Sequence, residues 1–293
     1  MRYERMQKVQ ELTKQLEDGL QKFVSSDEYL TYLKVMSRFH HYSFNNSILI
    51  AMQKPDATRV AGYSAWQTKF HRNVKRGEKG IQILAPYTYT VKEIDPDTEE
   101  EIEHKRQGYK IAYVYDISQT EGKDLPTCGV SELTDDVAGF QTLLGNLIQL
   151  SEVPVTFENI ESGAKGFFSP GNKNIVIQQD MPEAQTIKTL IHEITHSRLH
   201  NEDAMKKIMK EEGVKPDRYT KEVEAESVAY VVCNHFGIDT SEYSFSYVAG
   251  WSKSLELKEL KTSLKKIQET AAFFIDALEK KFTNTTPSEE ECI

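Results

Sequence analysis

The run HEITH at residues 192–196 carries the residue types that bind zinc in hydrolytic enzymes. His192 and His196 are four residues apart, so on a helix they share one face, with side-chain roots about 6 Å apart. Glu193 projects roughly 100° around the helix from His192, which suits a general base better than a third ligand. The pattern predicts a zinc hydrolase. The alternative is an amphipathic helix whose histidines are merely solvated.

A third protein ligand must come from elsewhere in the chain, since catalytic zinc usually takes three. His200 lies about 12 Å from His192 along a continuous helix, too far to complete the same tetrahedron. Glu222 and Glu226 share one face of a downstream helix, and carboxylates beside a core need a cation or donors. We expect Glu222 to bind the metal and Glu226 to accept the second N–H of a ligand histidine. The alternatives are the reverse assignment, Glu224 as ligand, or a solvated acidic face.

These residues predict hydrolysis of a peptide bond in a protein substrate that the sequence does not identify. The zinc ion would polarise a water and the scissile carbonyl, while Glu193 takes the water proton and passes it to the leaving amine. A nearby donor would stabilise the oxyanion. The candidates for that donor, or for a supporting position around the ligands, are His200, Tyr219, Tyr230 and His235, with Glu226 as the histidine partner.

The first half of the chain is basic, although the whole chain has a net charge of -9. Residues 38–92 contain nine Lys or Arg and two Asp or Glu, a local balance of +7, with aromatic residues between them. This mixture is typical of single-stranded DNA binding, where bases stack on rings and cations follow the phosphates. The alternative is a buried aromatic core under a solvated basic face. The expected DNA-binding residues are Arg38, Tyr42, Asn45, Asn46, Lys54, Arg59, Tyr63, Trp66, Lys69, Arg72, Lys75, Arg76 and Lys79.

The hydrophobic periodicity changes along the chain and predicts an α+β protein with two domains. Helical patterns come first and are followed by two β-rich runs, which predict a helical plus β-hairpin domain over 1–125. A Gly- and Pro-containing stretch marks the boundary. A helix, three short strands and further helices predict the second domain over 126–283, and 284–293 reads as an acidic, disordered tail. The last helix has an apolar face that suits packing on its own domain or a homo-oligomer.

Other features limit the class of protein. No apolar run is long enough to span a membrane, and the charged start does not look like a signal peptide, so we expect a cytoplasmic protein without a membrane partner. Cys128, Cys233 and Cys292 are too scattered for a disulfide framework or a thiolate zinc cluster. A metal site must therefore use histidine and carboxylate.

Two sets of motifs resemble one known family. YSFNNSILIAMQKPDATRVAGYSAWQ, RNVKRGEKGIQILAP and YDISQTEGKDLP, within residues 38–125, are similar to the N-terminal domain of ArdC-type antirestriction proteins, especially LtrC-like proteins of conjugative plasmids and transposons. HEITHSRLH and EVEAES resemble their zincin-like metallopeptidase domain, which is related to the ImmA/IrrE peptidases. In that pattern the acid three residues before Ala225 is the ligand, which points to Glu222. Glu226 follows the ArdC type, whereas the ImmA/IrrE branch usually has asparagine, so repressor cleavage is not carried over.

The resemblance implies a protein of a mobile element that binds single-stranded DNA and protects it from restriction during transfer. A regulatory peptidase that cuts a repressor or host protein is the main alternative. A DNA-binding protein with a catalytically silent zinc domain is the third. Salt-dependent binding of oligonucleotides separates the first from the second, and cleavage with Glu193 intact separates the third.

Overall fold

The computed structural model describes residues 2–22, 26–94, 101–125, 137–238, 251 and 255–283. Its contacts form two compact units, Met1–Lys22 with Asn45–Leu125, and Phe23–Phe44 with Pro126–Ile293. Both helices and sheets are present, which confirms the predicted two-domain α+β class. The predicted tail at 284–293, Cys128 and Cys292 lie outside the described residues. Among the described helices, none is long and apolar enough to cross a membrane.

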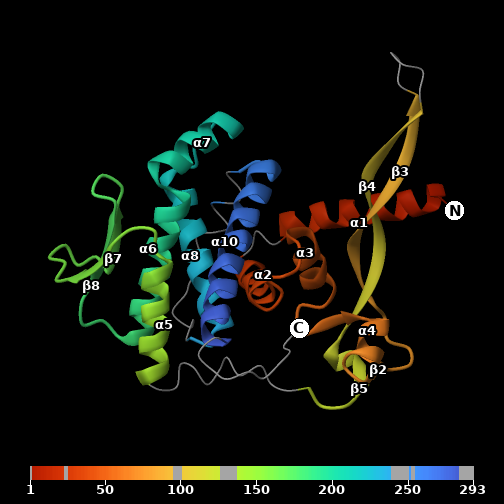
Figure 1. Cartoon of the computed structure of the whole chain (residues 1–293), viewed down its shortest axis with the longest axis horizontal. Helices are drawn as coiled ribbons and strands as arrows, with labels where there is room; N and C mark the ends of the chain where they lie inside the picture. The colour runs from red at the N-terminus through yellow and green to blue at the C-terminus, as the bar shows by residue number, and fades with distance from the viewer. Residues whose placement is uncertain are drawn as a thin grey trace. The chain divides into compact units, whose positions relative to one another are not determined.

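The first unit contains one long hairpin with helices beside it (Figure 1). Strands β3 (Ile81–Ile94) and β4 (Glu101–Asp116) pair antiparallel, and β1 (Val60–Gly62) adds to β4, so the sheet order is β1-β4-β3. Its helices are α1 (Arg2–Lys22), α3 (Phe44–Gln53) and α4 (Tyr63–Thr68). Two short strands, β2 (Arg72–Val74) and β5 (Thr120–Gly122), form a second sheet, and the 3-10 turn η1 (Ile117–Gln119) precedes β5.

Side-chain spacing explains how this unit is held together. Leu12, Leu16 and Leu20 recur every four residues and are 1–3% exposed, so they form the buried stripe of α1. Asn46 on α3 accepts from the backbone N–H of Leu84 and donates to its carbonyl, which fixes α3 to β3. The predicted helix and hairpin segments are found, whereas the three-residue strands β1, β2 and β5 carry too short a pattern to be recognised in sequence.

The second unit is mostly helical (Figure 1). It contains α2 (Ser26–Arg38), α5 (Val137–Leu150), α6 (Glu183–Leu199), α7 (Glu202–Glu212), α8 (Arg218–His235) and α10 (Leu257–Thr283). Helix α8 packs on α2, α6 and α10, and α10 also packs on α5. The apolar face of α10 is therefore covered within its own unit. Its buried residues include Leu260, Leu264, Ile267, Ala271, Phe274, Ile275 and Leu278.

A three-stranded sheet packs on α6. Its order is β6-β8-β7, with β8 (Asn174–Gln178) parallel to β6 (Val155–Glu158) and antiparallel to β7 (Gly166–Ser169). A Cβ placed on Gly166 would lie 2.7 Å from Cγ2 of Thr189, so the close approach of β7 to α6 requires glycine at this position. Strand β7 is thus held directly beside the helix that carries HEITH.

Two features of the second unit differ from the sequence reading. Helix α2 belongs with the second unit because Tyr29 hydrogen-bonds to Ser227 on α8, with 2.7 Å between the two oxygens, whereas periodicity alone placed this helix in the first domain. Helix α7 is short and rich in charged residues, so its hydrophobic pattern alone does not mark it as a separate helix. Its ends do carry a signal, because Asn201 caps its first turn and Gly213 ends it with a φ of 76°.

Candidate metal centre

The HEITH residues lie on α6, which places its apolar stripe in the core and its histidines toward α8. Ile187, Leu190, Ile191 and Ile194 are at most 1% exposed. Helix α8 is the neighbour with which α6 makes its most extensive contact. The polar residues of α8 on this side come from the run KEVEAES, so two helical faces with complementary chemistry meet.

Three potential ligand atoms form a compact triangle. His192 Nε2 and His196 Nε2 are 3.0 Å apart, and Glu222 Oε2 lies 3.5 Å from the first and 3.7 Å from the second. Tetrahedral zinc with bonds of about 2.0–2.1 Å would hold its ligand atoms about 3.3 Å apart. The three side chains fit one such ion with shifts of a few tenths of an ångström.

The outer nitrogens of both histidines have acceptors. His192 Nδ1 is 3.3 Å from Glu226 Oε2, and Lys188 is 3.5 Å from the other oxygen of Glu226. His196 Nδ1 is 2.8 Å from His200 Nδ1. When both outer nitrogens donate their protons, the two Nε2 lone pairs face each other and Glu222. The two lone pairs and the Glu222 carboxylate then repel one another unless a cation lies between them.

His200 continues into a buried chain of hydrogen bonds that ends on α10. Its Nε2 donates to Glu224 Oε2 over 2.9 Å, and Ser263 donates to Glu224 Oε1 over 2.6 Å. Glu224 is 1% exposed and so depends on these two donors. Burial lowers the pKa of His200 more than Glu224 raises it, which keeps the ring neutral and able to accept the proton of His196.

The charges of the centre attract a positive ion. Burial lowers the pKa of His192, but hydrogen bonds with Glu222 and Glu226 outweigh burial and raise that pKa to about 9. Hydrogen bonds with His192 and His196 hold the pKa of Glu222 well below its usual range. Without metal the centre therefore binds a proton at neutral pH, and a metal ion would displace it.

Glu193 lies beside the triangle rather than in it. The side chain is 7% exposed, and burial raises its pKa while the neighbouring His192 and His196 lower it. The backbone N–H of Phe168, on the edge strand β7, also hydrogen-bonds to this carboxylate. A carboxylate with a raised pKa next to the ligand atoms has the properties of a general base.

The proposed oxyanion donors are not equivalent. Tyr219 is 39% exposed, whereas Tyr230 is 2% exposed and buried in the core, where it is not available to a substrate. His200 is occupied by the chain to Glu224. His235 is bound elsewhere, to the carbonyl of Ser37 and the carboxylate of Glu279. Of these four, only Tyr219 has an exposed side chain.

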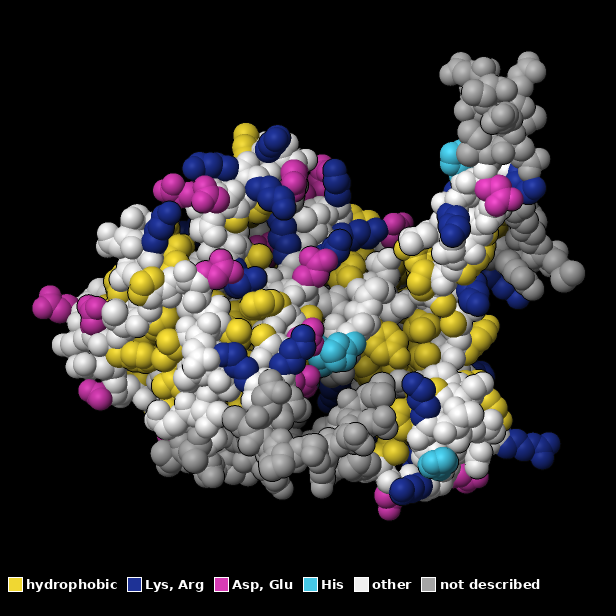
Figure 2. All heavy atoms as spheres, viewed as in Figure 1, with side chains coloured by type: hydrophobic (Ala, Val, Ile, Leu, Met, Phe, Trp, Pro, Cys, Tyr) yellow, Lys and Arg dark blue, Asp and Glu magenta, His cyan; other side chains and the backbone are white. Residues whose placement is uncertain are grey.

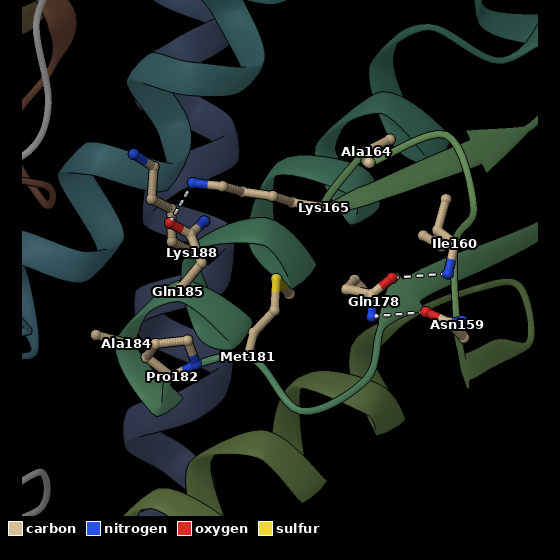
Figure 3. A pocket seen from close by; sticks show the side chains of 11 residues that line it. Asn159, Ile160, Ala164, Lys165, Gln178, Met181, Pro182, Ala184, Gln185 and Lys188 are labelled. Carbon is tan, nitrogen blue, oxygen red and sulfur yellow. Dashed lines mark hydrogen bonds between the residues drawn. The ribbon is translucent and has the colours of Figure 1, made fainter.

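A pocket of about 610 Å³ opens next to α6 (Figure 3). Lys165 donates to Gln185 over 2.8 Å at one side, and Gln178 donates to Asn159 at the other. Lys188 lines the pocket and also pairs with Glu226, so this residue connects the pocket to the supporting residues of His192. No pattern in the sequence indicates this cavity, because its lining comes from separate loops and the start of α6.

The predicted DNA-binding residues separate into buried and exposed groups. Trp66 is 1% exposed and donates its Nε1–H to the carbonyl of Tyr115, so its ring is not available to a base. Asn46 is held by Leu84, and Arg72 is 8% exposed and bound to Thr120 and neighbouring carbonyls. These three side chains are therefore not available to contact DNA, and the prediction is wrong for them.

The remaining members of that set have exposed or half-buried side chains. Arg38 and Tyr42 belong to the second unit. The others lie in the first unit, where Lys54 pairs with Asp56 over 3.0 Å. They are Asn45, Lys54, Arg59, Tyr63, Lys69, Lys75, Arg76 and Lys79.

Sequence reasoning missed a row of tyrosines on the hairpin. Tyr109 and Tyr113 are 57% and 52% exposed and, as odd-numbered residues of β4, point to the same face. Tyr63 on α4, which belongs to the predicted set, is 50% exposed and contacts Tyr115 edge to face, with 6.2 Å between ring centroids. The signal that could have found these rings is the period-two repeat of aromatic residues in YKIAYVY.

Two family models match consecutive parts of the chain. A family model described as the N-terminal domain of anti-restriction factor ArdC matches residues 3–116. A peptidase M78 model, described as the IrrE N-terminal-like domain, matches residues 150–235. An uncharacterized protein of Bacillus anthracis is 29% identical over 96% of this chain. The match covers 52% of that protein, so the chain spans about half the length of this relative.

One solved structure shows the same fold, and a second structure of the same protein matches less closely. The metal-free crystal structure of the antirestriction ArdC protein from plasmid R388 has a TM-score of 0.51 and 20% identity, covering 84% of this chain and 87% of that one. The Mn(II)-bound structure of that protein has a TM-score of 0.46 and 17% identity, with 87% and 99% covered. The two family models follow one another along the sequence. The chain is an ArdC-like two-domain protein, with an ArdC N-terminal domain followed by an IrrE-like domain of the peptidase M78 type.

Proposed function

We propose that this protein is an antirestriction protein of a mobile element that acts in the cytoplasm, binding single-stranded DNA and hydrolysing peptide bonds at a zinc centre. We assign DNA binding to the ArdC-type region within 1–125 and hydrolysis to the peptidase M78-type region within 126–283. The observation that supports hydrolysis best is the triangle of His192, His196 and Glu222 with the Glu193 carboxylate beside it.

In this proposal His192, His196 and Glu222 hold the ion. Zinc, when bound, supplies a positive charge that polarises a water and the scissile carbonyl. Glu193 accepts the proton of the attacking water and delivers it to the leaving amine, a transfer that its raised pKa favours. Glu226 and His200 fix the orientation of the two imidazoles by accepting their Nδ1 protons.

Strand β7 is the proposed position of the substrate. It is an edge strand of its sheet, and its Phe168 backbone already faces Glu193. An extended peptide that adds to this edge would bring its main chain past the general base, as in other cases of strand addition. The exposed Tyr219 is the donor that we assign to the oxyanion.

The test of hydrolysis uses wild type and Glu193→Gln with fluorescently labelled casein. Both proteins should bind zinc equally, because Glu193 is not a ligand. Cleavage by the variant should be at least about 100-fold slower, the contribution expected of a general base. Equal cleavage by the two proteins would reject this role of Glu193, and no cleavage by either would favour a metal centre without peptidase activity.

The proposed DNA surface combines exposed rings and cations of the first unit. Tyr63, Tyr109 and Tyr113 offer stacking faces, and Lys75, Arg76 and Lys79 lie in the loop that precedes β3. Figure 2 shows hydrophobic side chains gathered at the base of the hairpin with Lys and Arg side chains around them. This is the pairing of rings and charges that binds single strands without sequence readout.

Fluorescence anisotropy of the full chain with a labelled oligo(dT) strand tests this surface. Tyr109→Ser/Tyr113→Ser should weaken binding by about 10-fold or more, since each lost stack contributes about 1–3 kcal/mol. Tyr219→Ser, an exposed tyrosine of the second unit, is the matched control. Unchanged binding by the double variant would reject the tyrosine row as the DNA surface.

A further inference from the structure

The second unit contains another group of histidines and carboxylates outside the His192 centre. His40 and His41 follow α2, and Asp276 and Glu279 are three residues apart on one face of α10. Each side chain offers one ligand atom, and these four atoms all lie within 4.8 Å of one another. Chain segments more than 200 residues apart thus converge on one point.

The distances already approach those of a metal site. His40 Nε2 is 3.5 Å and His41 Nδ1 is 3.7 Å from Asp276 Oδ1. Ligand atoms around tetrahedral zinc are about 3.3 Å apart. Small rotations of these side chains would bring both nitrogens and the carboxylate around one ion.

The strongest indication is that buried polar atoms here lack partners. The His40 side chain is 6% exposed, yet among the described residues neither of its ring nitrogens has a hydrogen-bond partner, and the same is true of Asp276 Oδ1. Buried polar groups are nearly always satisfied. A cation between His40 and Asp276 would satisfy a nitrogen lone pair and the carboxylate oxygen together.

We propose that His40, His41, Asp276 and Glu279 form a second site for a divalent transition-metal ion. Two imidazoles and two carboxylates match zinc best, because this ion takes four ligands of these kinds. The set contains no thiolate and too few oxygens for calcium.

His235 orients one of the proposed ligands. Its Nε2 lies 2.9 Å from Glu279 Oε1, and its Nδ1 lies 2.8 Å from the carbonyl oxygen of Ser37. The ring also contacts His40 edge to face, with 5.0 Å between centroids. This fixed partner is the kind of support that metal-binding carboxylates usually have.

The site would have a structural role. Gln268 on α10 already donates to the carbonyl of Tyr42 over 2.8 Å, which attaches the segment after α2 to α10. A metal held by His40, His41 and α10 would add a second, stronger link at the same place. Zinc should then stabilise the folded second unit.

The experiment uses the full-length chain carrying His192→Ala/His196→Ala, so that the first centre is disabled. Equilibrium dialysis should find one zinc bound per chain, and zinc should raise Tm. Adding His41→Ala or Asp276→Asn should lower zinc affinity by about 10-fold or more and remove most of the Tm increase. His41 is 71% exposed, so its substitution leaves the fold intact. His104→Ala, an exposed histidine of the first unit, is the control.

Two results would overturn the proposal. One is that the double variant binds no zinc at micromolar free concentration. The other is that it binds zinc and gains stability, yet His41→Ala and Asp276→Asn behave like His104→Ala. Both results come from zinc binding and Tm rather than from peptidase activity, so neither of them tests the proposed function.

Discussion

Replacing His200 by leucine should weaken zinc binding although His200 is not a proposed ligand. The ring of His200 accepts the Nδ1 proton of His196 over 2.8 Å and passes the interaction to Glu224 over 2.9 Å. Removing such a supporting partner typically costs 10–100-fold in metal affinity, about 1.4–2.8 kcal/mol. His200→Leu should therefore raise the zinc Kd by one to two orders of magnitude.

The same change should also destabilise the metal-free protein. Glu224 is 1% exposed, and of its two hydrogen-bond donors among the described residues it would keep the hydroxyl of Ser263. Leaving a buried acceptor without one of its donors costs about 1–3 kcal/mol. Leucine at both His200 and Glu224 removes the uncompensated carboxylate, so that double variant should recover most of the stability. Its zinc affinity should stay low, because His196 still lacks its acceptor.

Two measurements separate these effects. Zinc affinity is measured by competition with a chromogenic chelator, and the free energy of unfolding by urea titration in EDTA. The variants are His200→Leu, the His200→Leu/Glu224→Leu double and the exposed control Glu202→Ala. If His200→Leu binds zinc as tightly as wild type, then His200 does not strengthen metal binding through His196. If the single and double variants have equal free energies of unfolding, then the loss of a donor to Glu224 is not the cause of the destabilisation.

Three further outcomes follow from other contacts. Burial raises the pKa of Asp116, but hydrogen bonds from Ser118, Thr58 and Arg59 outweigh burial and lower that pKa, so Asp116→Asn should destabilise the first unit at pH 7. Because the folded-state pKa is lowered, the difference in unfolding free energy between variant and wild type should shrink as pH falls below about 4. A difference that persists at that pH would contradict this cause. The pKa of about 9 at His192 means that zinc displaces a proton, so apparent zinc affinity should fall about tenfold per pH unit from pH 8 to 6, and a flat profile would count against it. The triple Lys75→Ala/Arg76→Ala/Lys79→Ala change should reduce the slope of log affinity against log salt concentration for oligo(dT) by about 2, measured by anisotropy. An unchanged slope would mean that these three residues do not contact the phosphates.

The spacing of residues along single helices is enough to predict much of the candidate metal centre. The i, i+4 spacing of the two histidines and of the two downstream glutamates, Glu222 and Glu226, is a property of single helices, so sequence alone predicts which atoms share a face. The link from Glu224 to Ser263 was not predictable in this way. It depends on how α8 packs on α10, and no local pattern encodes that register.

The same limit applies to the first unit and to the His40 group. Trp66 and Tyr109 are both aromatic residues near basic ones, yet the structure buries the first and exposes the second. Composition does not distinguish them. Strand alternation in β4 places Tyr109 on one face with Tyr113, whereas Trp66 lies on α4 and is buried by the packing of that helix. The meeting of His40 with Asp276 depends on a contact between distant segments, and neither segment alone indicates it.

Zinc binding to a chain in which the His40 group is disabled tests the central claim most directly. In the His41→Ala/Asp276→Asn background, equilibrium dialysis should find one zinc per chain, and adding Glu222→Ala should weaken its affinity by about 100-fold or more, whereas the exposed control Glu202→Ala should not. Equal zinc affinity with and without Glu222 would contradict a metal centre built from His192, His196 and Glu222.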